Sequence, residues 1–325
     1  MSAAVVLDVR HLAVHYRIAR PGGGHALLRA VEDASFSVRR GQTLGIVGES
    51  GSGKSSIACA LLRLVPAASG TAQFRGADLL ALEGAALQAT RRHVQMIFQD
   101  PLASLDLRMT VEDIIGEPLR VYARELSRAQ RRAEVLAMMQ RVGLAAEHLT
   151  RFPHEFSGGQ AQRIGIARAL ILKPEVVVCD EPLSALDVSI KSQISNLLKD
   201  LQQQLGLALL FISHDLAAVR FSCDEVLVLY LGRVMEIAPR DALFARPQHP
   251  YTRALLDAVP IPDPVAARAR RVAVLQGELP SPLTPPSGCV FRTRCPIAEE
   301  RCAREAPPAR QVGGSSVACH VAGRG

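Results

Sequence analysis

The sequence lacks an apolar run of the ~18 or more residues that a membrane-spanning helix needs. Its most apolar stretches, Val226–Leu231 and Leu207–Ile212, have the length of strands. The N-terminal segment alternates and carries Asp8 and Arg10, so it does not have the composition of a signal peptide. These absences predict a cytosolic protein whose attachment to a membrane would go through a partner.

Charged residues (21%) and low-complexity tracts are also scarce, which disfavours disorder over most of the chain. With 325 residues, 48% of them hydrophobic, the chain can bury one large core, or one core with a smaller appendage. The formal net charge of +7 comes mostly from scattered Arg, as on an ordinary solvated surface. Charge alone therefore does not indicate a nucleic-acid partner.

The first part of the chain has the pattern of strands followed by a strand–loop–helix unit. Alternation predicts strands over Val5–Tyr16 and Ala34–Val38, with a loop at Pro21–Gly24 between them. The apolar strand Leu44–Val47 runs into a glycine-rich turn, and a helix is expected over Ser55–Leu64. This unit predicts the start of an α/β domain.

Residues from about Thr110 to Phe156 have a purely helical character. Thr110-x-x-Asp113 and Ser127-x-x-Gln130 both fit capping boxes. The second of these helices is expected to stop at Gly143. Its predicted apolar face consists of Val135, Met139 and Val142.

After Gly158 the α/β alternation returns, so the fold class is an α/β core interrupted by a helical insertion. The expected elements are a helix to about Leu172, the strand Val176–Cys179, a helix near Ile190–Gln204, the strand Ala208–Ile212 and the strand pair Val226–Leu231 and Val234–Ile237. Past Pro247 frequent prolines break any long element and predict a small, irregular C-terminal region. These are Pro260, Pro262, Pro264, Pro280, Pro282, Pro285, Pro286, Pro296, Pro307 and Pro308.

The glycine-rich turn matches the phosphate-binding loop G-x-x-x-x-G-K-[ST]. It consists of Gly48, Glu49, Ser50, Gly51, Ser52, Gly53, Lys54 and Ser55. Glycines allow backbone N–H groups to surround a phosphate, and the helix that follows points its positive end at the same anion. Lys54 can reach the β- and γ-phosphates, and the Ser55 hydroxyl can complete Mg²⁺ coordination. Its place between a strand and a helix supports a nucleotide site.

Two carboxylates, Asp180 and Glu181, follow the apolar strand Val176–Cys179. Parallel α/β sheets bind ligands at the C-terminal ends of their strands. Asp180 can hold Mg²⁺ through water, and Glu181 can polarise an attacking water. Without the upstream loop, an ordinary surface turn would explain this pair equally well.

A third anion-binding pattern lies between these two motifs. Ser157, Gly158, Gly159 and Gln160 precede an apolar-periodic helix, and such a turn presents free N–H groups at the helix start. Gln99 ends the mostly apolar stretch Val94–Phe98, and His214 follows the strand Ala208–Ile212. With these residues in this order, the chain closely resembles the nucleotide-binding subunits of ABC transporters over roughly residues 5–250.

The resemblance implies a P-loop NTPase (RecA-like) core with an antiparallel β subdomain and a helical subdomain at about 100–160. It implies a role for each motif: Tyr16 stacks on adenine, Gln99 links Mg²⁺ to the helical subdomain, Ser157–Gln160 form the signature, Ser184–Asp187 the D-loop, and His214 contacts the γ-phosphate. In the family, ATP on the Gly48–Ser56 loop of one subunit is covered by the signature of a head-to-tail partner. Binding of ATP then closes the pair and hydrolysis reopens it.

Each of these residues also has a plainer explanation. Tyr16 alone would be core packing, His214 a turn histidine, and Gln99 alone would carry no meaning; Asp215 after His214 favours the switch role. Two departures from the family pattern are minor. Ser56 stands where Thr is commoner and keeps a hydroxyl for the α-phosphate, and Ala161 replaces a basic residue.

The C-terminal region, residues 251–325, resembles that of the oligopeptide/dipeptide importer ATPases. The similar segments are His249–Leu256, Gln276–Leu283, Pro285–Cys289, Arg294–Pro296 and, earlier in the chain, Phe98–Asp106. The Gln276–Gly288 stretch looks more like the second of the two ATPases that these importers pair. The resemblance implies two permease subunits, a second ATPase (a paralogue or a second copy), an extracytoplasmic solute-binding protein and a peripheral position on the cytoplasmic face of the inner membrane. It leaves the solute open.

The cysteines fall into two groups. Cys59, Cys179 and Cys223 lie singly in apolar surroundings and are expected to be core residues. Cys289, Cys295, Cys302 and Cys319 crowd into the C-terminal region, where the family resemblance allows a [4Fe–4S] cluster. Zinc and plain packing of reduced thiols are the alternatives, and the absence of a C-x-x-C pair weakens the zinc interpretation.

Three other classes of protein fit the sequence less well. ABC ATPases that remodel DNA carry long coiled coils, but only about 100 residues without sustained heptads separate Ser55 from Ser157. Ribosome-associated members usually hold two cassettes, and this chain has one. An interaction module without catalysis is disfavoured by intact Lys54, Asp180 and Glu181, and an exporter ATPase is disfavoured by the C-terminal region.

Overall fold

The computed structural model describes residues 4–19, 23–259 and 277–323. The chain forms two compact units, each assembled from separate stretches. Unit 1 consists of Met1–Asp8, Ser37–Thr43 and Gln73–Ile212, and unit 2 of Val9–Phe36, Leu44–Ala72 and Ser213–Gly325. Part of the expected Pro21–Gly24 loop, three of the expected prolines (Pro260, Pro262 and Pro264) and Gln276 lie outside the described residues.

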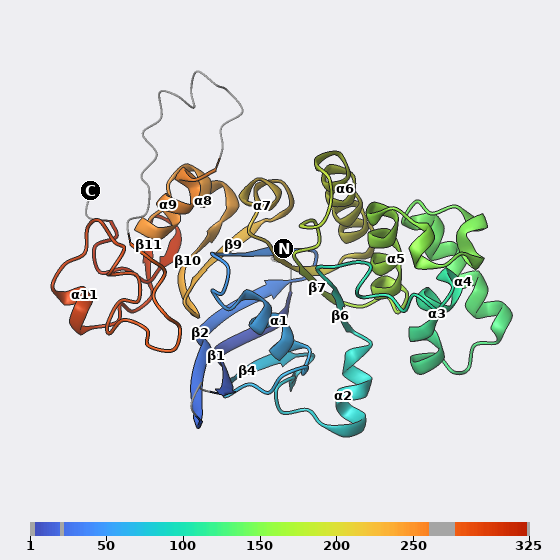
Figure 1. The fold of residues 1–325 in the computed structure, drawn as a ribbon, viewed down its shortest axis with the longest axis horizontal. Helices are drawn as coiled ribbons and strands as arrows, with labels where there is room; N and C mark the ends of the chain where they lie inside the picture. The colour runs from blue at the N-terminus through green and yellow to red at the C-terminus, as the bar shows by residue number, and fades with distance from the viewer. Residues whose placement is uncertain (1–3, 20–22, 260–276, 324–325) are drawn as a thin grey trace, which may run out of the picture. The chain divides into compact units, whose positions relative to one another are not determined.

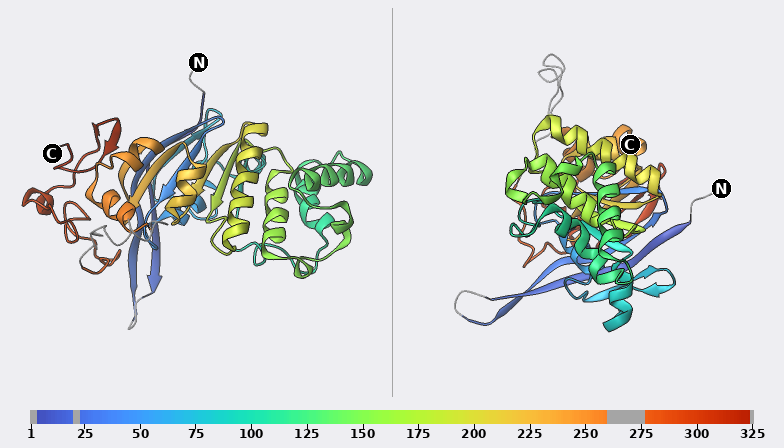
Figure 2. Two further views of the ribbon diagram at one scale, coloured as in Figure 1. Left: turned by 90° about the horizontal axis from the view of Figure 1, so that it is seen from above. Right: turned by 90° about the vertical axis from the view of Figure 1, so that its right-hand side faces the viewer.

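The long strands β1 (Val5–Ala19) and β2 (His25–Arg39) pass through both units and are neighbours in the sheet (Figure 2). Both are longer than the alternation predicted, and the added residues include exposed apolar side chains such as Leu27. The strand β4 (Ser69–Phe74) follows and forms a hairpin with the short β5 (Ala77–Asp78).

Unit 1 combines a parallel sheet with a bundle of helices (Figure 1). Its remaining elements are α2 (Gly84–Arg91), β6 (Val94–Ile97), α3 (Val111–Tyr122), α4 (Arg128–Arg141), the 3₁₀ helices η1 (Ala146–Thr150) and η2 (Pro153–Glu155), α5 (Gly158–Leu170), β7 (Val176–Asp180), α6 (Val188–Leu205) and β8 (Ala208–Ile212). Strand β7 pairs in parallel with β6 and with β8, and every residue of β7 and β8 is buried. Near-continuous apolar strands of this kind are typical of a sheet covered on both faces.

The helical segment of unit 1 begins and ends where its capping residues predict. Ser127 and Gln130 form a complete capping box at the start of α4, which ends at Arg141, two residues before Gly143. At α3 the Thr110 hydroxyl accepts the Asp113 N–H but donates to the Asp113 carboxylate, so only half of the predicted box forms. The other oxygen of the Asp113 carboxylate accepts from Arg120 instead of from the Thr110 backbone.

Unit 2 holds a mixed sheet and, after it, the C-terminal region. Its elements are β3 (Thr43–Val47), α1 (Lys54–Leu61), α7 (Leu216–Ser222), β9 (Glu225–Tyr230), β10 (Arg233–Pro239), α8 (Arg240–Ala245), α9 (Pro250–Asp257), α11 (Arg301–Arg304), β11 (Arg310–Val312) and β12 (Ser315–Val317). Strand β3 pairs in parallel with β9, which forms an antiparallel hairpin with β10. Strand β12 extends this sheet by pairing antiparallel with β10.

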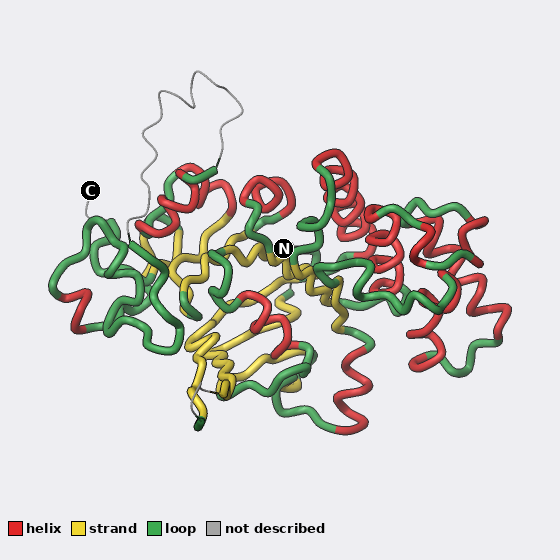
Figure 3. The backbone as a smooth tube through the Cα atoms, in the orientation of Figure 1, coloured by secondary structure: helices red, strands yellow, loops and turns green. Residues whose placement is uncertain are grey.

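The helix α1 ends at Leu61, three residues before its predicted end at Leu64. Arg63 has a φ of 54°, in the left-handed region, which breaks the helix. In the C-terminal region only short elements occur among the described residues, as the prolines predicted, and Figure 3 shows it mostly as loop. No helix among the described residues is long and apolar enough to cross a membrane.

Candidate functional site

The phosphate loop of unit 2 follows the buried strand β3 and leads into α1. Lys54, the first residue of α1, is 6% exposed, and its Nζ donates to the carbonyl oxygens of Gly48 (2.9 Å) and Glu49 (3.0 Å). The Lys54 side chain therefore connects the end of the loop to two carbonyl groups at its start. Gly53 has a φ of +106°, and a Cβ there would lie 2.2 Å from the carbonyl oxygen of Ala30, so glycine is required at this position.

The same loop packs directly on the strand β9. A Cβ on Gly48 would lie 2.1 Å from the carbonyl oxygen of Leu229, a contact that only glycine permits. The backbone N–H of Gly232, just after β9, donates to the carbonyl oxygen of Ser52 (2.9 Å). The first glycine and the middle of the loop are thus fixed against the strand and the turn that follows it.

Tyr16 and His214, two further residues that the sequence singled out, both lie in unit 2. The Tyr16 hydroxyl donates to the Ser56 hydroxyl oxygen at 3.2 Å, so the aromatic ring lies beside the first turn of α1. His214 directly precedes Asp215, whose carboxylate accepts the N–H groups of Ala217 and Ala218 and caps α7. The backbone around the histidine is therefore held at a helix start.

In unit 1, Asp180 and Glu181 stand at the end of the buried strand β7. Asp180 is 7% exposed, and Glu181 has a φ of 44°, a conformation that costs free energy for a residue with a side chain. The Gln99 amide donates to the Glu181 carboxylate at 3.2 Å, and the Ser184 hydroxyl donates to the Glu181 carbonyl oxygen at 3.0 Å. Gln99 and Ser184, which the sequence placed in two other motifs, therefore both contact Glu181.

The predicted signature turn forms the start of α5. The Ser157 hydroxyl accepts the Gln160 N–H (3.4 Å), and the Gln160 side chain accepts the Ser157 N–H (3.1 Å), which completes a capping box. A Cβ on Gly159 would lie 2.6 Å from Cγ2 of Ile190, on the neighbouring α6. Asp187 is the N-cap residue of α6, although its side chain makes no capping hydrogen bond.

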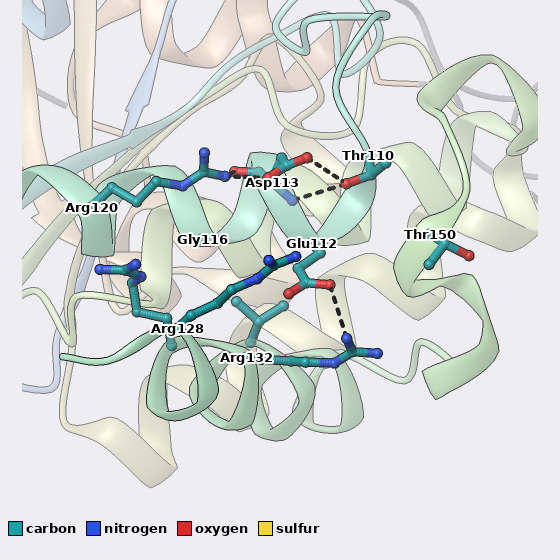
Figure 4. A pocket seen from close by; sticks show the side chains of 10 residues that line it. Thr110, Glu112, Asp113, Gly116, Arg120, Arg128, Arg132 and Thr150 are labelled. Atoms are coloured by element: carbon teal, nitrogen blue, oxygen red, sulfur yellow. Dashed lines mark hydrogen bonds and ion pairs between the residues drawn. The ribbon is translucent and has the colours of Figure 1, made fainter.

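A pocket of about 480 Å³ in unit 1 lies between α3 and α4 (Figure 4). Four arginines line it, together with Glu112 and Asp113. Arg132 pairs with Glu112 at 3.8 Å and Arg120 pairs with Asp113, so two of the four guanidinium groups are already neutralised within the wall. The pocket therefore has less positive charge than its arginine content indicates.

Of the three cysteines expected in the core, Cys179 and Cys223 are buried, whereas Cys59 is half-buried. Burial raises the pKa of Cys179 to about 12, as expected for a protonated core thiol. Cys289, Cys302 and Cys319 are buried within the C-terminal region, and burial raises the pKa of Cys289 and brings that of Cys295 to about 11. Across residues 4–19, 23–259 and 277–323, no group of three or more His, Cys, Asp or Glu side chains could hold a metal ion. The expected iron–sulfur or zinc site is therefore not supported.

Two contacts of the phosphate loop were not predicted from the sequence. The Tyr251 hydroxyl accepts the Glu49 N–H at 3.0 Å, and Arg294 forms an ion pair with the Glu49 carboxylate at 2.8 Å. Tyr251 and Arg294 belong to segments that resemble the importer family, but nothing in their local pattern indicates a partner 202 or 245 residues away.

Comparison with known proteins identifies the family. Residues 31–184 match the ABC transporter family, and residues 235–302 match the oligopeptide/dipeptide transporter C-terminal region. The oligopeptide transport ATP-binding protein OppF of Salmonella typhimurium is 52% identical over 307 residues, covering 93% of this chain and 92% of that protein. OppF of Escherichia coli is 51% identical over 320 residues, covering 97% and 96%.

Solved structures of ATP-binding cassettes share the fold. A dimeric cassette in a post-hydrolysis state, bound to ADP and phosphate, has a TM-score of 0.65 and 25% identity, covering 72% of this chain and 99% of that one. The cbiO1 protein of Clostridium perfringens, part of an ABC transporter complex, has a TM-score of 0.64 and 26% identity, covering 74% and 91%. This chain belongs to the ABC transporter ATPases, in the group of oligopeptide transport ATP-binding proteins.

Proposed function

We propose that this chain is the ATP-hydrolysing subunit of a peptide importer and works as one half of a head-to-tail ATPase pair. The observation that carries the catalytic part is Glu181, a carboxylate at the end of a buried strand that the Gln99 amide orients at 3.2 Å. A positioned carboxylate of this kind is suited to accept a proton from an attacking water.

Each motif has a role in this proposal. The phosphate loop of unit 2 holds the triphosphate of ATP through its backbone N–H groups and Lys54, while Tyr16 stacks on the adenine. Glu181 acts as the general base, Gln99 orients it, and His214 contacts the γ-phosphate. The signature turn Ser157–Gln160 and Asp187 act on the nucleotide bound to the partner subunit. The dimeric cassette with ADP and phosphate, at 25% identity, supports such a pair.

Mg²⁺ is the metal that ATP hydrolysis by this fold requires, and the residues present fit it. Ser55 offers a hydroxyl oxygen, Asp180 a carboxylate and Gln99 an amide oxygen, which are the hard oxygen donors that Mg²⁺ prefers. Asp180, 7% exposed, lies at the C-terminal end of the buried strand β7, where parallel α/β sheets bind ligands. Bound Mg²⁺ would neutralise phosphate charge.

The partners follow from the group to which the chain belongs. The importer would contain two permease subunits, a second ATPase and an extracytoplasmic solute-binding protein, with this chain bound peripherally at the cytoplasmic face of the inner membrane. Peptides are the proposed solutes, because the similar protein OppF is an oligopeptide transport ATP-binding protein. Solute choice belongs to the binding protein and the permeases.

The replacement Glu181→Gln tests the catalytic part of the proposal. It keeps the size and hydrogen-bonding ability of the side chain but removes its basicity, so ATP should still bind while turnover falls at least ~100-fold. Steady-state ATPase rates and binding of a fluorescent ATP analogue measure the two quantities. Near-normal turnover would remove Glu181 from the role of base.

Glu175→Gln is a matched control for this experiment. Glu175 is half-buried, immediately precedes β7 at the opposite end of the strand from Glu181, and pairs with Arg75 and with His93 (3.6 Å) in unit 1. Its replacement should leave turnover within about twofold of the parent, because it removes no group near the proposed base. An equal loss in both variants would point to damage of β7 rather than to loss of a base.

A further inference from the structure

The C-terminal region contacts the phosphate loop at one residue, Glu49, from two sides. The Tyr251 hydroxyl, on α9, accepts the backbone N–H of Glu49 at 3.0 Å. The Arg294 guanidinium donates to the Glu49 carboxylate at 2.8 Å, with the two side chains only 10% and 26% exposed. Both the backbone and the side chain of this loop residue are therefore bonded to the last part of the chain.

The groups that hold Glu49 are themselves rigidly packed. The rings of Tyr230, Tyr251 and Phe291 are all 0% exposed and contact one another, with centroids 4.7 to 5.3 Å apart in tilted or edge-to-face arrangements. Arg294 lies over the Tyr230 ring, 5.9 Å from its centroid. Such contacts between buried rings are favourable beyond their buried area. These three packed rings, here called the aromatic platform, therefore hold Arg294 in a fixed position beside the loop.

The ion pair is strong enough to matter for the loop. Burial lowers the pKa of Arg294, but its interactions with Glu49 and with Tyr230 together outweigh burial and raise the pKa. Charge-assisted hydrogen bonds between partly buried groups are roughly twice as strong as neutral ones. Among the described residues, the ion pair of Glu49 is with Arg294.

Glu49 connects these contacts to the lysine that binds phosphate. The carbonyl oxygens of Glu49 and its neighbour Gly48 are the groups to which Lys54 Nζ donates. The peptide unit before the Glu49 Cα is bonded to Tyr251 through the Glu49 N–H and to Lys54 through the Gly48 carbonyl, and the peptide unit after it is bonded to Lys54. A shift of Glu49 would move the acceptors of Lys54 and the first N–H groups of the loop.

We propose that the C-terminal region positions the phosphate loop, with Arg294 and Tyr251 fixing Glu49 so that the loop is shaped for ATP. The inference rests on the proposed ATPase function and adds two positioning residues to it. In this proposal the C-terminal region contributes to nucleotide binding without a metal bound to its cysteines. Neither residue touches the nucleotide in this proposal, so their loss should weaken ATP binding and leave the chemical step largely intact.

The experiment compares Arg294→Met with Arg292→Met in the full-length chain. Arg292 lies in the same segment, but its guanidinium donates only to the carbonyl and hydroxyl oxygens of Ser287 within the C-terminal region, at 2.9 and 3.3 Å. Arg294→Met should weaken binding of a fluorescent ATP analogue and raise the KM for ATP about tenfold, as expected for loss of one charge-assisted bond. Its kcat should stay within about twofold, and Arg292→Met should change neither quantity.

A double-mutant cycle with Glu49→Gln separates positioning from general support. If the ion pair carries the effect, Arg294→Met should weaken ATP binding no further in a Glu49→Gln background. Arg294→Lys, which keeps the charge but loses the planar fork, should restore part of the affinity. Unchanged ATP affinity in Arg294→Met, or an additive loss in the double variant, would overturn the proposal.

Tyr251→Phe covers the case in which Arg294→Met melts below the assay temperature. It removes only the hydroxyl that accepts the Glu49 N–H and keeps the packed ring. It should raise the KM for ATP a few-fold and speed hydrogen exchange of the Glu49 amide. Unaltered exchange and KM would overturn the proposal, whereas a parent protein that binds no ATP would instead overturn the proposed function.

Discussion

The signature turn of unit 1 and the phosphate loop of unit 2 are both helix starts suited to anions, yet they are held in opposite ways. The signature turn is fixed from within, because Ser157 and Gln160 cap one another across three residues. The phosphate loop is fixed from far along the chain, by Tyr251 and Arg294, which are 202 and 245 residues from Glu49. The capping bonds of the signature turn lie within its own motif, whereas the phosphate loop has distant support in addition to the bonds of its own Lys54.

The difference has a physical consequence for how each site fails. A locally capped helix start can be weakened by only one or two hydrogen bonds, each worth about 1 kcal/mol. A loop supported by distant packing depends on every group of the platform behind it. Substitutions in the C-terminal region of unit 2 should therefore change nucleotide binding more than substitutions that remove the cap of the signature turn.

The strongest way to test the long-range support is Phe291→Ala. The ring is 0% exposed and contacts both Tyr230 and Tyr251, so its removal should cost about 3–5 kcal/mol of unfolding free energy, as large-to-small core changes do. Urea denaturation followed by circular dichroism measures the loss. Hydrogen exchange should also quicken at the Glu49 amide, which Tyr251 holds.

Phe221→Ala is the matched control, since this ring belongs to the same unit but is 47% exposed. It should cost less than about 1 kcal/mol and leave exchange at Glu49 unchanged. A loss below about 1 kcal/mol for Phe291→Ala would mean that the aromatic platform does not stabilise the C-terminal region, and the contrast between the two sites would lose its basis.

Acid should weaken the same region through His249, with an intermediate effect. The imidazole is 1% exposed, its Nδ1 accepts the Tyr251 N–H, and burial lowers its pKa to about 3. Below pH 6.5 the unfolded chain takes up a proton that the native chain excludes, so stability present above that pH is lost as the pH falls toward 3. Between pH 6.5 and 5 the loss should be about 2 kcal/mol.

His249→Asn isolates this contribution. Asn can cap α9 by the same kind of acceptor but does not titrate. Urea denaturation at pH 5, 6 and 7 should show a smaller loss of stability in the variant than in the parent, by about 2 kcal/mol over this range. Identical pH profiles would show that His249 does not titrate differently in the folded and unfolded chains.

Features that depend on neighbouring residues could be predicted from the sequence, and contacts between distant residues could not. The strand–loop–helix unit, the capping box at Ser157 and the place of Glu181 after a buried strand rest on neighbouring residues, and their patterns were visible. The family resemblance singled out Gln99 and Glu181 separately, but their contact was not predicted, because it joins two strand ends that only the sheet brings together. The contacts of Tyr251 and Arg294 could not be predicted, since packing of short irregular segments leaves no period in the sequence.

Small errors in the fold have the same origin. The predicted helix to Leu64 is apolar from Ile57 to Leu62, but Arg63 adopts the left-handed conformation and ends the helix early. The helix α7 was not predicted, because its seven residues are too few to establish a period. The four C-terminal cysteines carried a pattern suited to a cluster, but among the described residues no metal-holding group forms.

The smallest expected effect tests the locally held site, by comparing Ser157→Ala with Ser127→Ala. Both serines open a helix of unit 1 with the same Ser-x-x-Gln capping box, and both variants should lose about 1 kcal/mol of stability. Only Ser157 lies in the signature turn, so only its replacement should lower ATPase activity, by about tenfold for one lost bond to a charged phosphate. Equal activity in the two variants would make Ser157 a cap and nothing more. Because the two caps share their geometry, a difference in activity cannot come from helix stability, and it would show that the signature turn acts on nucleotide.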